Sequence, residues 1–250
     1  MAALNFIEAG RVIDTSIYPV KGMRGVSMNE ISLRSISVVG DRARAFTITD
    51  ARQTPTLLDT TKFPGLLHYV PSLLTPEDPR ISEILVRTPN GHTYSADSNE
   101  LLKEISAKCG RELAILRMGR GAYHSMPVSL LSTASIGAIE EKAGFPLDPR
   151  RFRENIIVET REGDPYEEDA WVGKLIKFGD SEDAAIIAGV KLDPRCATVN
   201  MDPMTGEQKP EVLKAIVEKR GKDVPLGIYA TVVREGKIRK GDTIYVASFR

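Results

Sequence analysis

Short apolar runs bounded by glycine, proline and polar turn residues recur along almost the whole chain. Short runs with this composition are typical of β-strands rather than of helices. The expected strands cover residues 11–20, 26–39, 44–49, 81–87, 92–96, 112–118, 155–161, 174–178, 184–192, 197–201, 227–234 and 243–248. The Asn90-Gly91 pair between the fourth and fifth of them predicts a hairpin turn.

The segment after this hairpin has the spacing of an amphipathic helix. Asp97 is expected to begin it, because Glu100 follows three residues later as in a capping box. Gly110 is expected to end it, as glycine does at many helix C-termini. The face that packs on the core would carry Leu101, Ile105 and Cys109. Cys109 is therefore interpreted as a small core residue.

Two further helices are expected later in the chain. One covers residues 133–143 and ends at Gly144. The other has Pro210 in its first turn, ends at Gly221, and has an apolar face formed by Leu213, Ile216 and Val217. Many short strands with few helices favour a mainly β fold of the α+β class, built on a barrel or closed sheet. Strands and helices do not alternate regularly, so a doubly wound parallel sheet is not expected.

Charge and composition narrow the classes of function. The 250 residues include 34 basic and 34 acidic ones, which gives a formal net charge of +0. A chain without a basic surplus is not expected to be a dedicated nucleic-acid binder, because such binders neutralise phosphates. No apolar run approaches the roughly 20 residues of a membrane span, and the first ten residues lack the pattern of a secretory signal. Two cysteines make no disulfide framework, so the expected location is the cytoplasm.

Cys196 lies in the segment DPRCATVNMDPMTGE, directly after Arg195 and before a tight turn. A neighbouring cation favours the thiolate, which is both a nucleophile and a metal ligand. A plain buried cysteine fits these local features equally well. No zinc site is expected, because the chain lacks CxxC and HxxxH patterns and scatters its three histidines, His68, His92 and His124.

Charged residues beside predicted turns leave two interpretations open. The basic ones are Lys21, Arg42, Arg52 and Arg153. Side chains in such positions suit the capture of a phosphate or carboxylate, but each one alone fits a solvated surface charge better. The acidic stretch GDPYEEDAW could orient a substrate or support a metal. For Glu167 and Glu168 individually, a solvated turn anchored by a buried Trp171 fits better.

Taken in their order along the chain, these segments resemble a MOSC protein, a family named for the C-terminal domain of molybdenum cofactor sulfurases. The resemblance covers nearly the whole chain and is weakest over residues 63–123. It is most specific in the RC…DP.TG block and the terminal G.I..GD..Y block. The arrangement is similar to the subgroup that contains the mitochondrial amidoxime-reducing component and its bacterial relatives. The segments concerned are YPVKGMRG, GDRARAFTITD, RFRENIIVE, DPYEEDAWVGKLIKFGD, DPRCATVNMDPMTGEQKPEVLKAI and PLGIYATVVREGKIRKGDTIYV.

The resemblance implies a small β-rich MOSC N-terminal domain over residues 1–120 and a β-barrel MOSC domain over residues 121–250. It also implies the molybdenum cofactor, a molybdopterin, with Cys196 as metal ligand and catalytic residue. A thiolate suits thiophilic molybdenum, and the basic residues would share one anionic target, the cofactor phosphate. The implied cofactor-binding residues are Lys21, Gly22, Arg42, Ser125, Arg153, Asn155 and Arg195.

Four positions depart from the pattern of the family. The segment YHSMP has His124 and no aspartate, and Glu154 replaces a proline. Asp193 stands where some relatives have a second cysteine, and Gly22 replaces a residue that is often serine. These departures concern the substrate and the reaction more than the cofactor.

The implied function is a molybdenum-dependent oxidoreductase that removes oxygen from an N-hydroxylated small molecule by oxygen-atom transfer. The chain has no flavin or nicotinamide fingerprint, and two cysteines cannot hold a four-cysteine iron–sulfur cluster. Electrons would therefore come from a separate protein of the ferredoxin or flavoprotein type. One alternative is a non-redox sulfur carrier with a persulfide on Cys196, or a protein that handles the cofactor. Another is a MOSC-like barrel without cofactor that binds a different small anion.

Overall fold

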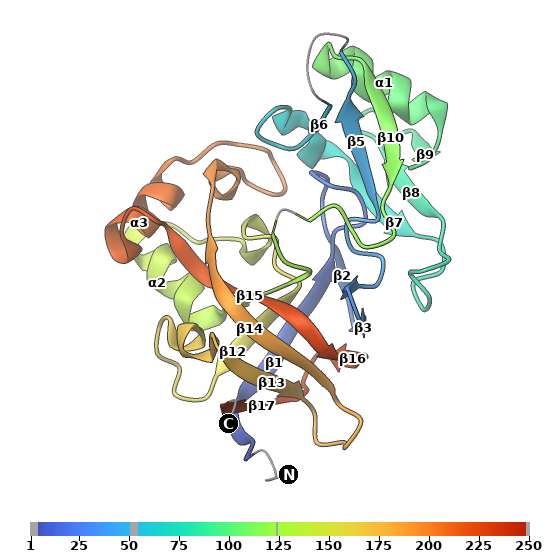
Figure 1. Ribbon diagram of the computed structural model, residues 1–250. Helices are drawn as coiled ribbons and strands as arrows, with labels where there is room; N and C mark the ends of the chain where they lie inside the picture. The colour runs from blue at the N-terminus through green and yellow to red at the C-terminus, as the bar shows by residue number, and fades with distance from the viewer. Residues whose placement is uncertain (1–4, 51–54, 124, 249–250) are drawn as a thin grey trace.

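The computed structural model describes residues 5–50, 55–123 and 125–248. Arg52 and His124 lie outside the described residues. Within them, seven strands close into a barrel, because β1 returns to pair with β12 (Figure 1). Of the barrel pairs, β11 and β12 are parallel and the others antiparallel. In order, the strands are β12 (Ile156–Thr160), β11 (Val128–Ser132), β15 (Pro225–Arg234), β14 (Ala185–Pro194), β13 (Lys174–Phe178), β17 (Thr243–Ser248) and β1 (Ile7–Ile17).

A smaller lobe lies beside one end of the barrel (Figure 1). It contains two three-stranded sheets, the helix α1 (Asn99–Cys109) and the 3-10 helix η1 (Pro64–His68). The sheets of the lobe are β10 (Leu113–Arg117) with β5 (Arg44–Ile48) and β6 (Thr56–Leu57), and β7 (Val70–Leu73) with β8 (Ile84–Arg87) and β9 (Thr93–Ser95).

The first strands of the chain belong to the barrel side of the molecule. β1 is a barrel strand, and β2 (Val26–Met28) pairs with it. β3 (Glu30–Arg34) pairs with β4 (Ser37–Val38) and with β16 (Gly236–Arg239). The N-terminal part is thus interwoven with the C-terminal part. A division into domains at residues 1–120 and 121–250 stays a proposal.

Helices α2 (Thr133–Ala143) and α3 (Glu211–Arg220) lie next to each other on one side of the barrel (Figure 1). They share an apolar cluster, separate from the main core, that includes Ile136, Ile139 and Ile216. Burying such side chains contributes about 1.5–3 kcal/mol each. The connections contain the 3-10 helices η2 (Pro149–Arg151), η3 (Glu167–Trp171) and η4 (Ala197–Asn200). Within the described ranges, no helix is both long enough and apolar enough to cross a membrane.

The predicted hairpin and the helix ends are confirmed. β8 and β9 pair antiparallel across the Asn90-Gly91 turn, where Gly91 has a φ of 86°. Gly110 and Gly144 follow α1 and α2 in left-handed conformations, with φ of 67° and 82°. A side chain at these φ values is strained, which explains why glycine ends both helices.

The predicted start of α1 at Asp97 is wrong by one position. The cap is Ser98, whose hydroxyl accepts a hydrogen bond of 3.2 Å from the backbone N–H of Leu101. Asp97 is instead held by Arg44, through contacts of 2.6 and 2.9 Å. An aspartate that pairs with an arginine of a neighbouring strand is not available as a cap.

Three other predictions require correction. Residues 197–200 form the 3-10 helix η4 and not a strand, because the backbone N–H of Val199 turns back to the carbonyl of Cys196 at 3.2 Å. Val199 then packs into the α2–α3 cluster. Val217 is 39% exposed and not on the buried face of α3, where Val212 is buried instead. Residues 26–39 divide into three short strands.

The acidic stretch is also not the solvated turn expected for Glu168. Glu168 is 0% exposed and accepts a hydrogen bond of 3.2 Å from the backbone N–H of Ser132. This carboxylate therefore fixes η3 against the start of α2. Trp171 is buried, as predicted.

Candidate functional site

A cavity of about 360 Å³ lies where the end of the barrel meets residues 21–22, 42 and 59–61. Cys196 lies on its wall together with Lys21, Arg42 and Arg153. A cavity of about 480 Å³ elsewhere, beside Trp171 and Val246, is larger but lacks a thiol and has a single basic side chain, Lys174. Chemistry rather than size therefore identifies the candidate site.

The sulfur of Cys196 is accessible, since Cys196 is exposed. The residue has an extended backbone at the end of β14, directly before η4. Its Sγ lies 3.3 Å from the hydroxyl of Thr198. The hydroxyl of Thr198 is also 3.1 Å from that of Thr60, which comes from the other side of the cavity. The thiol is thus oriented by a short hydroxyl chain.

Lys21 provides a buried ammonium group in the cavity wall. The residue is 4% exposed, and its Nζ donates a hydrogen bond of 2.8 Å to the carbonyl of Ala122. Burial, with a further contribution from the nearby Arg42, lowers the pKa of Lys21 to about 8, although Asp59 opposes the shift. A bound anion would raise the pKa of this lysine again.

Arg42 and Arg153 enclose the ring of Tyr18. Their guanidinium carbons lie 5.0 Å and 4.4 Å from the ring centroid. Arg42 pairs with Asp41, and Arg153 donates to the carbonyl of Met23 at 2.8 Å. Burial lowers the pKa of Arg153 to about 10, although the nearby Tyr18 and Asp41 oppose the shift. This arrangement holds two cations in place without a bound anion.

Three residues of this wall have positive φ. The values are 83° at Gly22, 48° at Arg42 and 60° at Arg153. Such backbone conformations are strained for a residue with a side chain, and they cluster at binding sites. A Cβ on Gly22 would lie 2.6 Å from Cδ1 of Leu66, so glycine is needed next to Lys21.

Arg195 lies beneath the cavity, and its N–H groups are directed to protein partners. Nε donates to the carbonyl of Leu226 at 2.7 Å, and Nη1 donates to the carbonyl of Phe152 at 2.9 Å. The guanidinium also pairs with two buried carboxylates, Glu154 and Asp193. It contributes to the lining of the cavity, but this hydrogen bonding fits support of the wall better than direct contact with an anion.

Two of the expected site residues are not brought to the cavity. Asn155 is 1% exposed, and its amide donates to the carbonyl of Ser16 at 3.2 Å and accepts from the backbone N–H of Ser129 at 3.3 Å. It therefore joins barrel strands. Ser125 is exposed and does not line the cavity, whereas Ser129 does.

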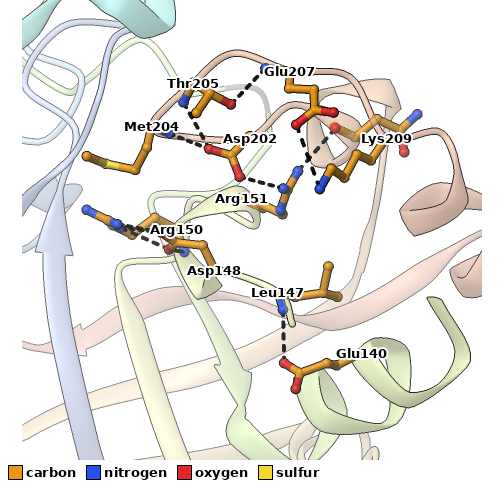
Figure 2. A network of polar contacts seen from close by, with 11 residues as sticks. Glu140, Leu147, Asp148, Arg150, Arg151, Asp202, Met204, Thr205, Glu207 and Lys209 are labelled. Atoms are coloured by element: carbon orange, nitrogen blue, oxygen red, sulfur yellow. Dashed lines mark hydrogen bonds and ion pairs between the residues drawn. The ribbon is translucent and has the colours of Figure 1, made fainter. Parts of the chain in front are cut away.

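The turn after Cys196 is fixed by Asp202 (Figure 2). Its Oδ1 accepts from the backbone N–H groups of Met204 and Thr205, both at 2.9 Å. Its Oδ2 accepts from Arg151 at 2.7 Å. Arg151 lies in η2, two residues before Arg153. Its contact with Asp202 therefore connects the DP.TG turn, residues 202–206, to the segment that carries Arg153.

Several lining residues were not predicted from the sequence. Asp59, Thr60 and Thr61 approach from the smaller lobe in a segment that has no motif. Tyr229 lies in the PLGIYA segment, and Thr198 lies two residues after the cysteine. Among these residues, only Thr198 could have been found from the sequence, because it lies two residues after Cys196. The other lining residues could be found only once the pairing of the strands was known.

The fold and the site define a β-barrel protein with an accessible thiol beside a basic cavity. The family model described as MOSC domain matches residues 93–245, more than half of the chain. The protein therefore belongs to the MOSC domain family.

Curated relatives resemble part of the chain, and a solved structure resembles its fold. The chain is 32% identical over 130 residues to mitochondrial amidoxime reducing component 2 of Rattus norvegicus, a match that covers 48% of this chain and 36% of that protein. The same figures hold for the protein of that name from Bos taurus. The matches thus span little more than a third of the length of these relatives. The crystal structure of the YuaD protein from Bacillus subtilis covers 99% of this chain and 100% of its own, with a TM-score of 0.51 and 15% identity, which shows a shared fold.

The residues of the cavity fit a cofactor of the molybdopterin type. An accessible thiol can ligate a thiophilic metal. Lys21, Arg42 and Arg153 supply positive charge for a phosphate. The cavity volume is in the range of small-molecule sites.

Proposed function

We propose that the chain binds the molybdenum cofactor through Cys196 and reduces an N-hydroxylated small molecule with it. The observation that carries this proposal is that the thiol of Cys196 and the three basic side chains line one cavity. The resemblance to amidoxime reducing components supports the reaction class, and the region that matches the family model, residues 93–245, includes Cys196. When bound, the cofactor would supply the oxygen-atom transfer and the two-electron redox change.

The protein's own residues would bind and orient the cofactor and shield the site from water. Lys21, Arg42 and Arg153 would hold the phosphate end of the cofactor. Thr198 and Thr60 would hold the sulfur of Cys196 in one orientation through their hydroxyl contacts of 3.3 and 3.1 Å. Arg195 would position the wall behind the cysteine. Asn155 and Ser125 stay weaker proposals, because neither lines the cavity.

Electrons would arrive from a separate protein of the ferredoxin or flavoprotein type. Cytoplasmic location likewise stays a proposal. The test of the function is turnover of an N-hydroxylated compound, such as benzamidoxime, with a chemical electron donor. Conversion by protein from a host that makes the cofactor, and none by protein from a host that cannot, is expected. Absence of conversion by molybdenum-containing protein would contradict the reductase assignment.

A second candidate is a sulfur carrier, which the exposure of Cys196 favours. A persulfide on Cys196 would release thiocyanate with cyanide. The two functions separate cleanly, because a carrier would show cyanide-labile sulfur without turnover, whereas a reductase would show turnover without it.

A further inference from the structure

Lys191 is an exposed cation of β14 that is not one of the basic residues lining the cavity. Its Nζ lies 5.9 Å from the centroid of the Tyr229 ring. Tyr229 is half-buried and lines the cavity together with Cys196. An ammonium group at this distance from an aromatic ring is attracted to it. The charge of Lys191 is therefore held beside the cavity that contains the thiol.

The pairing of β14 with β15 gives Lys191 this position. Lys191 and Tyr229 are direct partners in the antiparallel pair, so their side chains leave the sheet on the same face. Asp193, two residues further along β14, lines the cavity. The register shifts on both sides of the segment formed by Lys191 and Leu192. Such irregularities bend a strand and redirect its side chains, and they are frequent beside functional sites.

The charge of Lys191 is not balanced by an ion pair within residues 5–50, 55–123 and 125–248. Asp193, the acid that follows it on the strand, is buried and paired with Arg195 through a contact of 3.0 Å. The contact with the Tyr229 ring uses none of the three N–H donors of the ammonium group. These donors are therefore available to an anion that enters the cavity.

The chemistry of this position matches a carboxylate on an apolar group. One ammonium group compensates one carboxylate, whereas a phosphate is matched better by several cations, such as the three that line the cavity. The ring of Tyr229 adds an apolar surface next to the charge of Lys191. A ligand with an apolar body and a carboxylate at one end would contact both side chains.

We infer that Lys191 is a specificity-determining residue and that the substrate carries a carboxylate in addition to its N–OH group. This inference rests on the proposed function, because the cofactor phosphate would occupy the three basic side chains of the cavity and leave Lys191 to the substrate. The N–OH group would lie on the side of Cys196, the apolar body beside Tyr229, and the carboxylate at Nζ of Lys191. Lys191 acts on binding alone and takes no part in the transfer of protons or electrons.

Binding is tested by NMR in the chain without cofactor, with the lysines isotope-labelled by reductive methylation. Pyrophosphate is added first to fill the basic cluster of the cavity. The para-carboxylate of benzamidoxime is then expected to shift the Lys191 signal, which is identified by its absence in Lys191→Arg, whereas benzamidoxime should not shift it. Lys177 is the internal control, because its Nζ lies 4.9 Å from the ring centroid of its cross-strand partner Tyr245, which does not line the cavity. A Lys191 signal that does not move, or that moves equally with both compounds, would overturn the inference.

The choice of substrate is tested in cofactor-loaded protein. The measured quantity is kcat/KM for the para-carboxylate of benzamidoxime divided by kcat/KM for benzamidoxime. Lys191→Met is expected to lower this ratio by up to about fivefold, the upper end for an exposed ion pair, and Lys191→Glu should lower it further. Lys177→Met should keep the wild-type ratio.

The two proposals fail in different ways. Equal ratios in the wild type and in Lys191→Glu would reject the role of Lys191 in specificity and leave the reductase assignment standing. Protein that holds molybdenum but reduces neither compound would reject the proposed function, and the NMR signal of Lys191 would then decide the binding claim by itself.

Discussion

The hydroxyl groups of Thr60 and Thr198 lie 3.1 Å apart, although 138 positions separate them in the chain. Thr198 is at the same time 3.3 Å from the sulfur of Cys196. The contact therefore joins the smaller lobe to the segment that carries the thiol. It also explains how a cysteine on an exposed turn can keep one orientation.

Thr198→Val is expected to loosen the thiol without unfolding the protein. The loss of one hydrogen bond costs about 1 kcal/mol of stability. Because groups that orient a metal ligand affect metal affinity about tenfold or more, molybdenum content should fall. The measurement is metal per chain beside the thermal midpoint. Thr47→Val serves as the control, since it also loses one hydroxyl hydrogen bond, to the carbonyl of Thr56 at 3.2 Å, but does not line the cavity. Equal metal content in the two variants would show that Thr198 has no such role.

Anion binding should depend on the charge of Lys21. With its pKa at about 8, the lysine is charged below that pH and neutral above it, so binding should weaken as the pH rises through 8. Lys21→Met should bind pyrophosphate about tenfold more weakly at pH 7, because one charged hydrogen bond is lost, and should not show this pH effect. Calorimetry at pH 7 and 9 measures both. Lys174→Met, at the other cavity, should behave as the wild type.

Gly22→Ala is expected to destabilise the fold by about 2 kcal/mol, through positive φ and the clash with Leu66. Gly91→Ala is the matched control. Its φ is 86°, close to the 83° of Gly22, but no atom lies within 4 Å of the position of the added carbon. Denaturant unfolding should therefore show a clearly smaller loss for Gly91→Ala. Similar losses in the two variants would mean that packing at Gly22 does not matter.

The free energy of unfolding should depend on pH because of Glu154. Its pKa rises from 4.5 to about 7 on folding. A raised acid pKa favours folding below 4.5, and this contribution is lost as pH rises to 7. Relative to the wild type, Glu154→Gln should thus gain up to about 3 kcal/mol of stability between pH 4.5 and pH 7. Unfolding at several pH values measures this gain. A constant difference across that range would show that Glu154 is ionised throughout.

Local patterns predicted most of the fold. Strands β5, β13 and β17 and helices α1, α2 and α3 follow from apolar spacing and terminal glycines. The wrong predictions concern segments whose backbone conformation depends on tertiary contacts. Apolar and polar residues alternate over residues 197–201 as in a strand. Val199 instead packs in the α2–α3 cluster, and the chain turns there as the 3-10 helix η4. The short strand β16 became visible only through its pairing with β3.

The site was predicted in part, for similar reasons. Lys21, Arg42, Arg153 and Cys196 lie in recognisable segments, and the structure brings them to one cavity. Thr60 and Tyr229 have no local signal, because only the closed barrel and the adjoining lobe place them there. Asn155 and Ser125 were implied by resemblance, and their side chains lie outside the cavity wall.

The central claim is that Cys196 anchors a molybdenum cofactor. The most direct test is molybdenum and released pterin per chain, in protein from a cofactor-making host, for the wild type, Cys196→Ser and Cys109→Ser. Near-stoichiometric metal in the wild type and in Cys109→Ser, with loss in Cys196→Ser, is the predicted result. Folded wild-type protein without molybdenum and pterin, or equal metal in all three proteins, would contradict it.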